Sequence, residues 1–231
     1  MNDHSDIAEA VVRVRERIAL AARRSGRKPE DVLLVAVSKT VPAAGIREAI
    51  AAGITEIGEN RVQEAAEKHH EVQGPVRWHL VGHLQTNKAG KALEIFDWIH
   101  SIDSLHVAQA VGKRAQERGK GIPVLMEVNT SGEASKYGIT PKRALEEVEQ
   151  IGRIEGIEVK GLMTVGLFGP EKEVRGCFHT LRELREEITR RGFPGVTMEH
   201  LSMGMTSDFE AAIEEGATMV RIGTAIFGAR S

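Results

Sequence analysis

Short apolar runs alternate with amphipathic helical patterns along the chain. The runs are rich in β-branched and aliphatic side chains, and Gly, Pro or Asn stands at the joins. Strands are therefore predicted at Val32–Val37, Ile54–Ile57, Val76–Val81, Trp98–His100, Ile122–Val128, Ile157–Met163, Val196–Glu199 and Ala217–Ile222. A helix is expected after each strand, which is the alternation typical of α/β proteins with a parallel sheet.

One further helix is predicted before the first strand. Apolar residues recur at helical spacing from Ile7 to Ile18, Ser5 can cap this helix, and Gly26 can end it. Eight strand–helix units with an extra N-terminal helix are the count for a (β/α)₈ TIM barrel. An open doubly wound sheet stays possible, because counting strands does not show closure. A dinucleotide-binding sheet is disfavoured, because no GxGxxG motif follows the first strand.

The composition of the chain limits its possible partners, domain number and cellular compartment. The 231 residues include 31 basic and 33 acidic side chains, a net charge of −2 that gives no general attraction to nucleic acid or anionic membranes. No linker-like stretch divides the sequence, so residues 1–231 are expected to form one domain. The one cysteine, Cys177, excludes an intrachain disulfide and suits a reducing cytoplasm. No apolar run approaches the roughly 18 residues of a membrane span, so we expect a soluble, cytoplasmic protein.

Polar and small residues follow the predicted strands. In a parallel barrel these positions meet at one face, where a binding pocket is expected. After the last two strands stand Ser202, Gly204, Gly223 and Thr224. Glycine N–H groups and hydroxyls of this kind can bind a phosphate. A plainer interpretation is that Gly223 only turns the chain and Ser202 caps the next helix.

Lys39 follows the first strand. At a barrel mouth, desolvation would favour the neutral amine, which is a nucleophile. Opposite a phosphate site, such an amine suits a phosphorylated aldehyde, which it would hold as a Schiff base. The alternative is an ordinary solvated lysine.

Two further residues are candidates. Arg221 interrupts an apolar strand, so its charge must face a ligand or a structural partner, for which Glu199 and Glu127 are the candidates. Asn60 can be a ligand or simply the N-cap of the second helix. His79 and His83 do not share a face as zinc ligands would, because they lie on a strand and its exit, and Cys177 is expected to be a buried apolar residue.

At these positions the sequence resembles a known family. The strings VAVSKT, GENRVQE, WHLVGHLQTNK, VNTSGEASKYG, GLMT, LSMGMTSDFEAAI and MVRIGTAIFGAR closely resemble the pyridoxal phosphate homeostasis proteins, which are related to the N-terminal barrel of bacterial alanine racemases. The match runs from Leu33 to Arg230. One departure is Thr206, which stands where the family usually has Ser and keeps the hydroxyl.

The resemblance implies a barrel like that of fold-type III enzymes of pyridoxal 5′-phosphate (PLP) and assigns roles to the candidates. Lys39 matches the lysine that holds PLP covalently as an internal aldimine. Ser202, Gly223 and Thr224 match the phosphate cradle, Arg221 the arginine facing the pyridine nitrogen, and Asn60 a neighbour of the ring. No metal is implied. A guanidinium disfavours protonation of that nitrogen, which leaves PLP a weaker electron sink.

Two functions are the main hypotheses. The first is a non-catalytic carrier that holds PLP reversibly, maintains its intracellular level and supplies apoenzymes. The second is a PLP-dependent amino acid racemase, which needs a second base. In the racemases resembled here, that base is a Tyr from an additional C-terminal β domain of a partner chain, and we expect no counterpart of that domain in this protein. A barrel acting on sugar phosphates through Lys39 is a third hypothesis.

Two expectations depend on the same comparison with the racemases. Tyr137, the one tyrosine, is the only phenol available as a second base, although loop packing is its expected role. We expect no counterpart of the racemase domain that forms dimers, and therefore expect a monomer.

Overall fold

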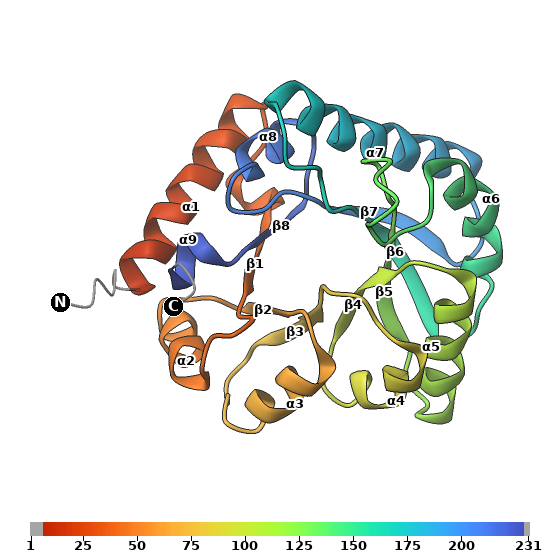
Figure 1. Cartoon of the computed structure of the whole chain (residues 1–231), viewed down its shortest axis with the longest axis horizontal. Helices are drawn as coiled ribbons and strands as arrows, with labels where there is room; N and C mark the ends of the chain where they lie inside the picture. The colour runs from red at the N-terminus through yellow and green to blue at the C-terminus, as the bar shows by residue number, and fades with distance from the viewer. Residues whose placement is uncertain (1–6, 229–231) are drawn as a thin grey trace.

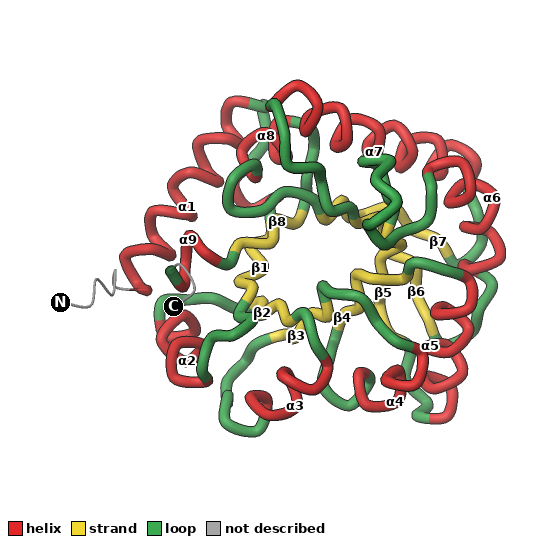
Figure 2. The backbone as a smooth tube through the Cα atoms, viewed as in Figure 1, coloured by secondary structure: helices red, strands yellow, loops and turns green. Residues whose placement is uncertain are grey.

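Eight parallel strands close into a barrel in the computed structural model, which describes residues 7–228. The strands pair in sequence order from β1 to β8, and β8 pairs back onto β1, as the ring in Figure 2 shows. Their bounds are β1 Leu33–Val37, β2 Glu56–Glu59, β3 Arg77–Leu80, β4 Trp98–Ile102, β5 Ile122–Glu127, β6 Ile157–Met163, β7 Val196–Ser202 and β8 Met219–Ile222. The predicted (β/α)₈ barrel is confirmed, and the open sheet is wrong.

Helices surround the barrel (Figure 1). They are α1 Ile7–Arg24, α2 Ala43–Ala51, α3 Val62–His69, α4 Ala89–Ala92, α5 Leu105–Glu117, α6 Pro141–Gly152, α7 Glu171–Arg191, α8 Phe209–Glu214 and α9 Thr224–Phe227, with 3₁₀ turns at Pro29–Asp31 and Thr86–Lys88. Ser104 and Thr140 cap α5 and α6 through their hydroxyls. The helices cover the apolar outer face of the strands, as a parallel sheet requires.

The extra N-terminal helix is confirmed. α1 buries one apolar stripe, which includes Val11, Val14 and Ile18, and packs against α8, α9 and α2 (Figure 1). It therefore covers the part of the barrel where the first and last strands meet. Gly26, at φ +71°, follows the helix as expected. The proposed cap, Ser5, lies outside the described residues.

The strand limits differ from expectation in two places that matter for the site. β2 begins at Glu56 and continues through Gly58 and Glu59, two residues beyond the predicted end at Ile57. β7 extends to Ser202 rather than ending at Glu199, so Ser202 lies on a strand and not in a loop.

The length of β7 depends on an irregular pairing with β6. Val159 pairs with Val196, but Gly161 pairs with His200, so β7 uses two residues more than β6 over this interval. A Cβ on Gly161 would lie 2.0 Å from the His200 carbonyl oxygen, and Gly161 has φ +157°. Only glycine permits this approach.

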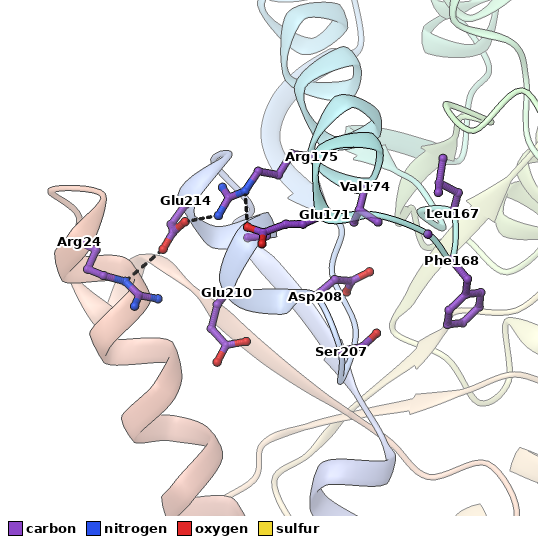
Figure 3. A pocket seen from close by; sticks show the side chains of 12 residues that line it. Arg24, Leu167, Phe168, Glu171, Val174, Arg175, Ser207, Asp208, Glu210 and Glu214 are labelled. Atoms are coloured by element: carbon purple, nitrogen blue, oxygen red, sulfur yellow. Dashed lines mark hydrogen bonds and ion pairs between the residues drawn. The ribbon is translucent and has the colours of Figure 1, made fainter.

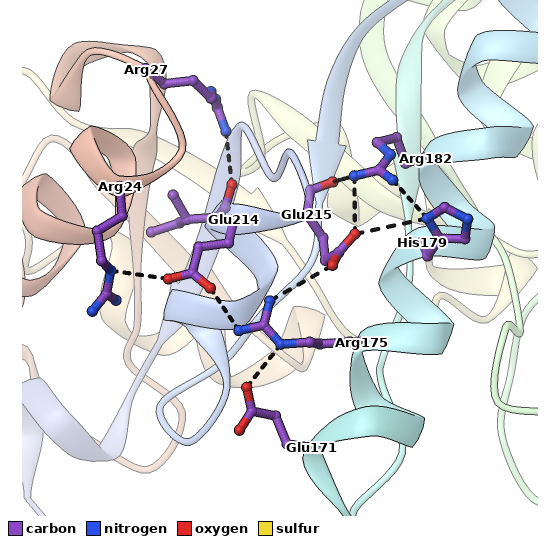
Figure 4. A network of polar contacts seen from close by, with 9 residues as sticks. Arg24, Arg27, Glu171, Arg175, His179, Arg182, Glu214 and Glu215 are labelled. Atoms are coloured by element: carbon purple, nitrogen blue, oxygen red, sulfur yellow. Dashed lines mark hydrogen bonds and ion pairs between the residues drawn. The ribbon is translucent and has the colours of Figure 1, made fainter.

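Ion pairs join the outer helices. Arg175 of α7 binds Glu171 and also Glu214 of α8, which in turn binds Arg24 of α1. Glu215 extends this outer network to Arg182 and His179 (Figure 4). Within the described residues, no helix is long and apolar enough to cross a membrane.

Candidate functional site

The six candidate residues lie at the carboxyl ends of the strands. Ser202 is the last residue of β7 and Arg221 the third residue of β8, while the other four directly follow β1, β2 and β8 or lie one residue beyond; these are Lys39, Asn60, Gly223 and Thr224. β8 pairs with β1, and a Cβ on Gly223 would lie 3.1 Å from the carbonyl oxygen of Val37. The residues therefore gather at one end of the barrel, as predicted.

Lys39 is half-buried, and its ammonium group has no hydrogen bond or ion pair with the described residues. The backbone around it is nevertheless held firmly. Ser38, fully buried, donates its hydroxyl to Glu59 at 2.6 Å, and Lys68 donates to the Ser38 carbonyl at 2.8 Å. These contacts fix the backbone that leads to Lys39, and the role of its amine stays a prediction.

Lys68 lies at the centre of a cluster behind Lys39. Besides the Ser38 carbonyl, its ammonium group binds Glu59 at 2.9 Å and Glu64 at 2.6 Å, which uses all three of its protons. Burial raises the pKa of Glu59, although bonds from Ser38 and Lys68 oppose this effect. We call Ser38, Glu59, Glu64 and Lys68 the Lys68 cluster.

The residue after Lys39 has an unusual backbone. Thr40 has φ +64°, the one positive φ among non-glycine residues in the described part of the chain. A β-branched residue rarely adopts this region, because its Cβ approaches the backbone. Its N–H donates to Glu64 at 2.5 Å, so the Lys68 cluster holds this conformation and fixes where Lys39 leaves the backbone.

Arg221 is buried with two uncharged partners. Its guanidinium donates to the Ser202 hydroxyl at 2.7 Å and to the Thr164 carbonyl at 2.9 Å. Burial lowers its pKa to about 10, while attraction to Glu127 and Asp208 opposes the shift. Glu199 is excluded as its partner, because that carboxylate is exposed and binds Thr197 and Lys160. Glu127 acts on Arg221 by charge, without a hydrogen bond between them.

The capping interpretations of Asn60 and Ser202 are wrong. Arg61 occupies the N-cap position of α3 and Asp208 that of α8. The Asn60 amide has no partner among residues 7–228. A Cβ on Gly82 would lie 2.4 Å from the Asn60 carbonyl oxygen, so the end of β3 packs tightly against this residue.

The loops after β7 and β8 are joined by a hydroxyl. The N–H of Ala225 donates to Thr206 at 3.4 Å, which links the two segments expected to hold phosphate. The backbone N–H of Gly223 and the hydroxyl of Thr224 have no partner in the described part of the chain. The Ser202 hydroxyl instead lies below the surface, in contact with Arg221 and His100. Its membership of the phosphate cradle stays a prediction.

Sequence reasoning missed a buried carboxyl group at the same end of the barrel. Glu127, the last residue of β5, is 6% exposed. Burial first, and then the nearby Asp103 carboxylate, raise the pKa of Glu127 to about 7. The sequence signal for Glu127 is the same as that for Arg221, a charged residue at the end of an apolar strand. The sequence analysis names Glu127 only as a candidate partner of Arg221.

Comparisons with known proteins identify the family. The family model described as "Alanine racemase, N-terminal domain" matches residues 11–231. A pyridoxal phosphate homeostasis protein of Pseudomonas aeruginosa is 43% identical, with 98% of this chain and 96% of that protein covered. The chain belongs to the pyridoxal phosphate homeostasis protein family.

Solved structures of similar sequence share the architecture. An uncharacterised protein from Bifidobacterium adolescentis is 42% identical with a TM-score of 0.91, and the match covers 98% of this chain and 97% of that one. PipY of Synechococcus elongatus, solved with PLP bound, is 40% identical with a TM-score of 0.81, covering 93% and 100%. The family barrel is thus compatible with bound PLP.

The donor set at the mouth fits PLP. The molecule carries an aldehyde, a phosphate and a pyridine nitrogen. The aldehyde requires an amine, the phosphate requires hydrogen-bond donors such as N–H and hydroxyl groups, and the pyridine nitrogen requires a further polar group. Lys39, Gly223, Thr224 and Arg221 supply these groups, and the first three have polar atoms without partners among the described residues.

A separate cavity lies on the flank of the barrel. It has a volume of about 540 Å³ and is lined by parts of α1, α7 and α8 and by the loop before α7, including Arg24, Asp208, Glu214 and the exposed Phe168 (Figure 3). None of the six candidate residues lines it, so it is distinct from the candidate site.

Proposed function

We propose that this protein binds PLP through a Schiff base to Lys39 and serves as a PLP carrier in vitamin B6 homeostasis, without strong catalytic activity of its own. The observation that carries the proposal is an amine without a partner on a rigidly held loop. Most lysines are solvated and mobile, whereas Lys39 follows a buried residue and precedes a constrained one. Such an amine is placed for repeated, reversible condensation with an aldehyde.

The other residues divide the remaining contacts. Gly223 and Thr224 offer an N–H and a hydroxyl to the phosphate, with Ser202 beside them, and Asn60 lies next to the ring. Arg221 faces the pyridine nitrogen. Because a guanidinium is a permanent donor, it keeps that nitrogen unprotonated and limits PLP as an electron sink. This arrangement favours storage over catalysis.

Borohydride trapping tests the site. The Lys39 amine would condense with the aldehyde of PLP with loss of water, and borohydride would then reduce the resulting C=N bond to a stable amine. Peptide mapping of the wild type should give one labelled peptide, containing Lys39, and Lys39→Ala should abolish the label. Lys91→Ala is the matched control, because Lys91 is an exposed lysine paired with Glu94. Equal labelling of Lys39→Ala at another lysine would refute the assignment.

Racemisation is the second candidate function, and one observation supports it. The Tyr137 ring, 58% exposed, stacks on His83 with centroids 3.9 Å apart, and His83 contacts Asp103 at 2.9 Å. The only phenol thus lies near the barrel mouth, joined to a His–Asp pair. The α-proton exchange of alanine, measured in deuterated water with saturating PLP, distinguishes the two candidate functions. The carrier proposal expects exchange far below about 1 per second, and a rate at or above it would favour the racemase.

Carriage implies release to recipients. We propose that a cytoplasmic monomer transfers PLP to apoenzymes, and the single buried cysteine, Cys177, is compatible with that compartment. Mixing the loaded protein with an apoenzyme should restore the latter's activity faster than an equal amount of free PLP at low concentration. Restoration no faster than by free PLP would argue against direct transfer.

A further inference from the structure

A continuous path of hydrogen bonds runs through the interior of the barrel behind Arg221. From Arg221 it passes to the Ser202 hydroxyl at 2.7 Å and to His100 Nδ1 at 3.1 Å. It continues from His100 Nε2 to His79 Nδ1 at 2.9 Å, and from His79 Nε2 to Glu56 at 2.7 Å. All five residues are buried. We call them the interior path.

The path crosses from one end of the barrel to the other. Ser202 on β7 and His100 on β4 contact each other although their strands are not neighbours, so their hydrogen bond spans the interior. Glu56 is the first residue of β2, at the end opposite the candidate site. There Arg77 binds the Glu56 carboxylate through Nε and Nη2, with a shortest contact of 2.6 Å.

The ends of the path restrict where its protons lie. Arg221 can only donate, and an ionised Glu56 can only accept. Because burial lowers the pKa of both histidines, we assign them as neutral. His79 then donates from Nε2 to Glu56 and accepts at Nδ1 from His100 Nε2, so His100 Nδ1 accepts from the Ser202 hydroxyl, which itself accepts from Arg221. Both histidines therefore carry the proton on Nε2.

The charges in the surroundings agree with this assignment. Burial lowers the pKa of His79 and lowers that of His100 well below the ordinary value. Around His79 lie Glu56, Arg77 and Asp97, and around His100 lie His79, His200 and Arg221. Burial would raise the pKa of Glu56, but bonds from His79 and Arg77 outweigh it, so the carboxyl stays ionised.

The path is suited to holding groups in place rather than to conducting protons. Moving a proton from Arg221 to Glu56 would take it from a group with a pKa of about 10 to a carboxylate whose pKa is below its usual value. That transfer is strongly unfavourable. A directed row of neutral groups between two fixed charges instead restrains each member's rotation.

We propose that Glu56, His79 and His100 are positioning residues that, through Ser202, hold the Arg221 guanidinium in one orientation toward the bound cofactor. This inference rests on the proposed function for the role of Arg221. The Arg221 guanidinium at the mouth is thus oriented by the Glu56 carboxylate at the opposite end of the barrel. The Ser202 proton is also committed to His100, so Ser202 donates to a phosphate only if this bond is given up.

Nitrogen NMR of the protein without PLP tests the path directly. The ¹⁵N shifts of the imidazole rings distinguish the two neutral forms and the imidazolium. We expect both His79 and His100 in the Nε2–H form at neutral pH, with assignment by His79→Gln and His100→Gln. An Nδ1–H form or an imidazolium at either residue would overturn the proposal. Because no PLP is present, this result is independent of the proposed function.

Glu56→Gln tests the effect on the site. The substitution keeps the shape of the side chain but removes the charge that fixes the direction of the path. We expect the Kd for PLP to rise about tenfold, and the pH dependence of the bound PLP absorption band to shift. Glu199→Gln is the matched control, a carboxylate on β7 that contacts Thr197 and Lys160 but not the path. Its Kd should stay within about twofold of the wild type.

Two results would contradict the positioning role. Glu56→Gln could leave both Kd and absorption profile unchanged, or Glu199→Gln could change them equally, which would indicate a general charge effect. If instead neither the wild type nor any variant is labelled at Lys39 by borohydride, the proposed function fails while the NMR result stands.

Discussion

The Lys68 cluster and the outer network use the same chemistry in different surroundings. Lys68 contacts Glu59 and Glu64 at 2.9 and 2.6 Å, and Arg175 contacts Glu171 and Glu214 at 2.8 and 2.6 Å. The distances are nearly equal. The Glu59 side chain, however, is fully buried and Lys68 is 12% exposed, whereas Arg175 is 32% and Glu171 72% exposed.

Burial, not contact distance, decides what each set of ion pairs contributes. Removing one partner of a buried pair leaves a charge without compensation, which costs about 3–5 kcal/mol. An exposed pair is worth roughly 0–1 kcal/mol, because water and salt screen it. The cluster behind Lys39 should therefore be sensitive to substitution, and the outer network tolerant.

Lys68→Met should have the largest effect on stability. It leaves Glu59 without a cation, so the free energy of unfolding should fall by about 3–5 kcal/mol in urea denaturation. The double variant Lys68→Met, Glu59→Leu removes both charges and should recover most of the loss. A loss below about 1 kcal/mol for Lys68→Met would place the cluster in the same class as surface pairs.

Glu127→Gln tests a buried carboxyl group that has no cation bonded to it. Burial raises its folded-state pKa to about 7 from an ordinary value of 4.5. Between these values the folded state binds more protons than the unfolded state, so stability falls as pH rises through the window. Glu127→Gln should match the wild type near pH 4 and exceed its unfolding free energy by about 3 kcal/mol at pH 8. A constant difference across pH would contradict this account.

Thr40→Asn tests whether the Lys68 cluster holds a strained residue. Asn tolerates the positive φ of this position better than a β-branched residue, so unfolding free energy should increase by about 1 kcal/mol. Thermal and urea denaturation measure the change. Thr40→Val keeps the branching and should give no gain; equal stabilisation by both variants would exclude relief of strain as the cause.

Arg175→Gln should have the smallest effect. Glu214 keeps Arg24 at 3.0 Å and Glu215 keeps Arg182 at 3.0 Å, while Glu171, which loses its partner, is 72% exposed and stays solvated. The unfolding free energy should change by less than about 1 kcal/mol, and the difference should shrink further in 0.5–1 M salt. A loss comparable to that of Lys68→Met would show that exposure is not the deciding variable.

The architecture could be predicted from the sequence because the spacing of apolar residues, and the Gly, Pro or Asn residues between elements, are local features of the chain. The order of strands and helices, the N-terminal helix and the buried stripe of α7 with Cys177 all follow from spacing of apolar residues. The gathering of Lys39, Ser202 and Arg221 at one end followed from a topological rule about parallel strands. These conclusions need no knowledge of which side chains touch.

The supports of the site could not be predicted, because they depend on contacts between distant segments. His79 and His100 are 21 residues apart and look like ordinary strand histidines in the sequence. Lys68 lies on a polar helix, where solvent exposure is the default expectation. The left-handed Thr40 also carries no local signal, since Gly or Asn would normally mark such a backbone.

The bulge at Gly161 sets the depth of the site. With regular pairing after Val159, Met163 would stand opposite His200; the two additional residues of β7 put Ser202 there instead. The strand is thereby drawn back by one pleat repeat, about 7 Å. Because the offset is even, the same side chains still face inward. Gly161 on β6 thus determines how deep Ser202 lies in the barrel. It places the Ser202 hydroxyl below the rim, at the level of His100, three strands away, with which it forms a hydrogen bond.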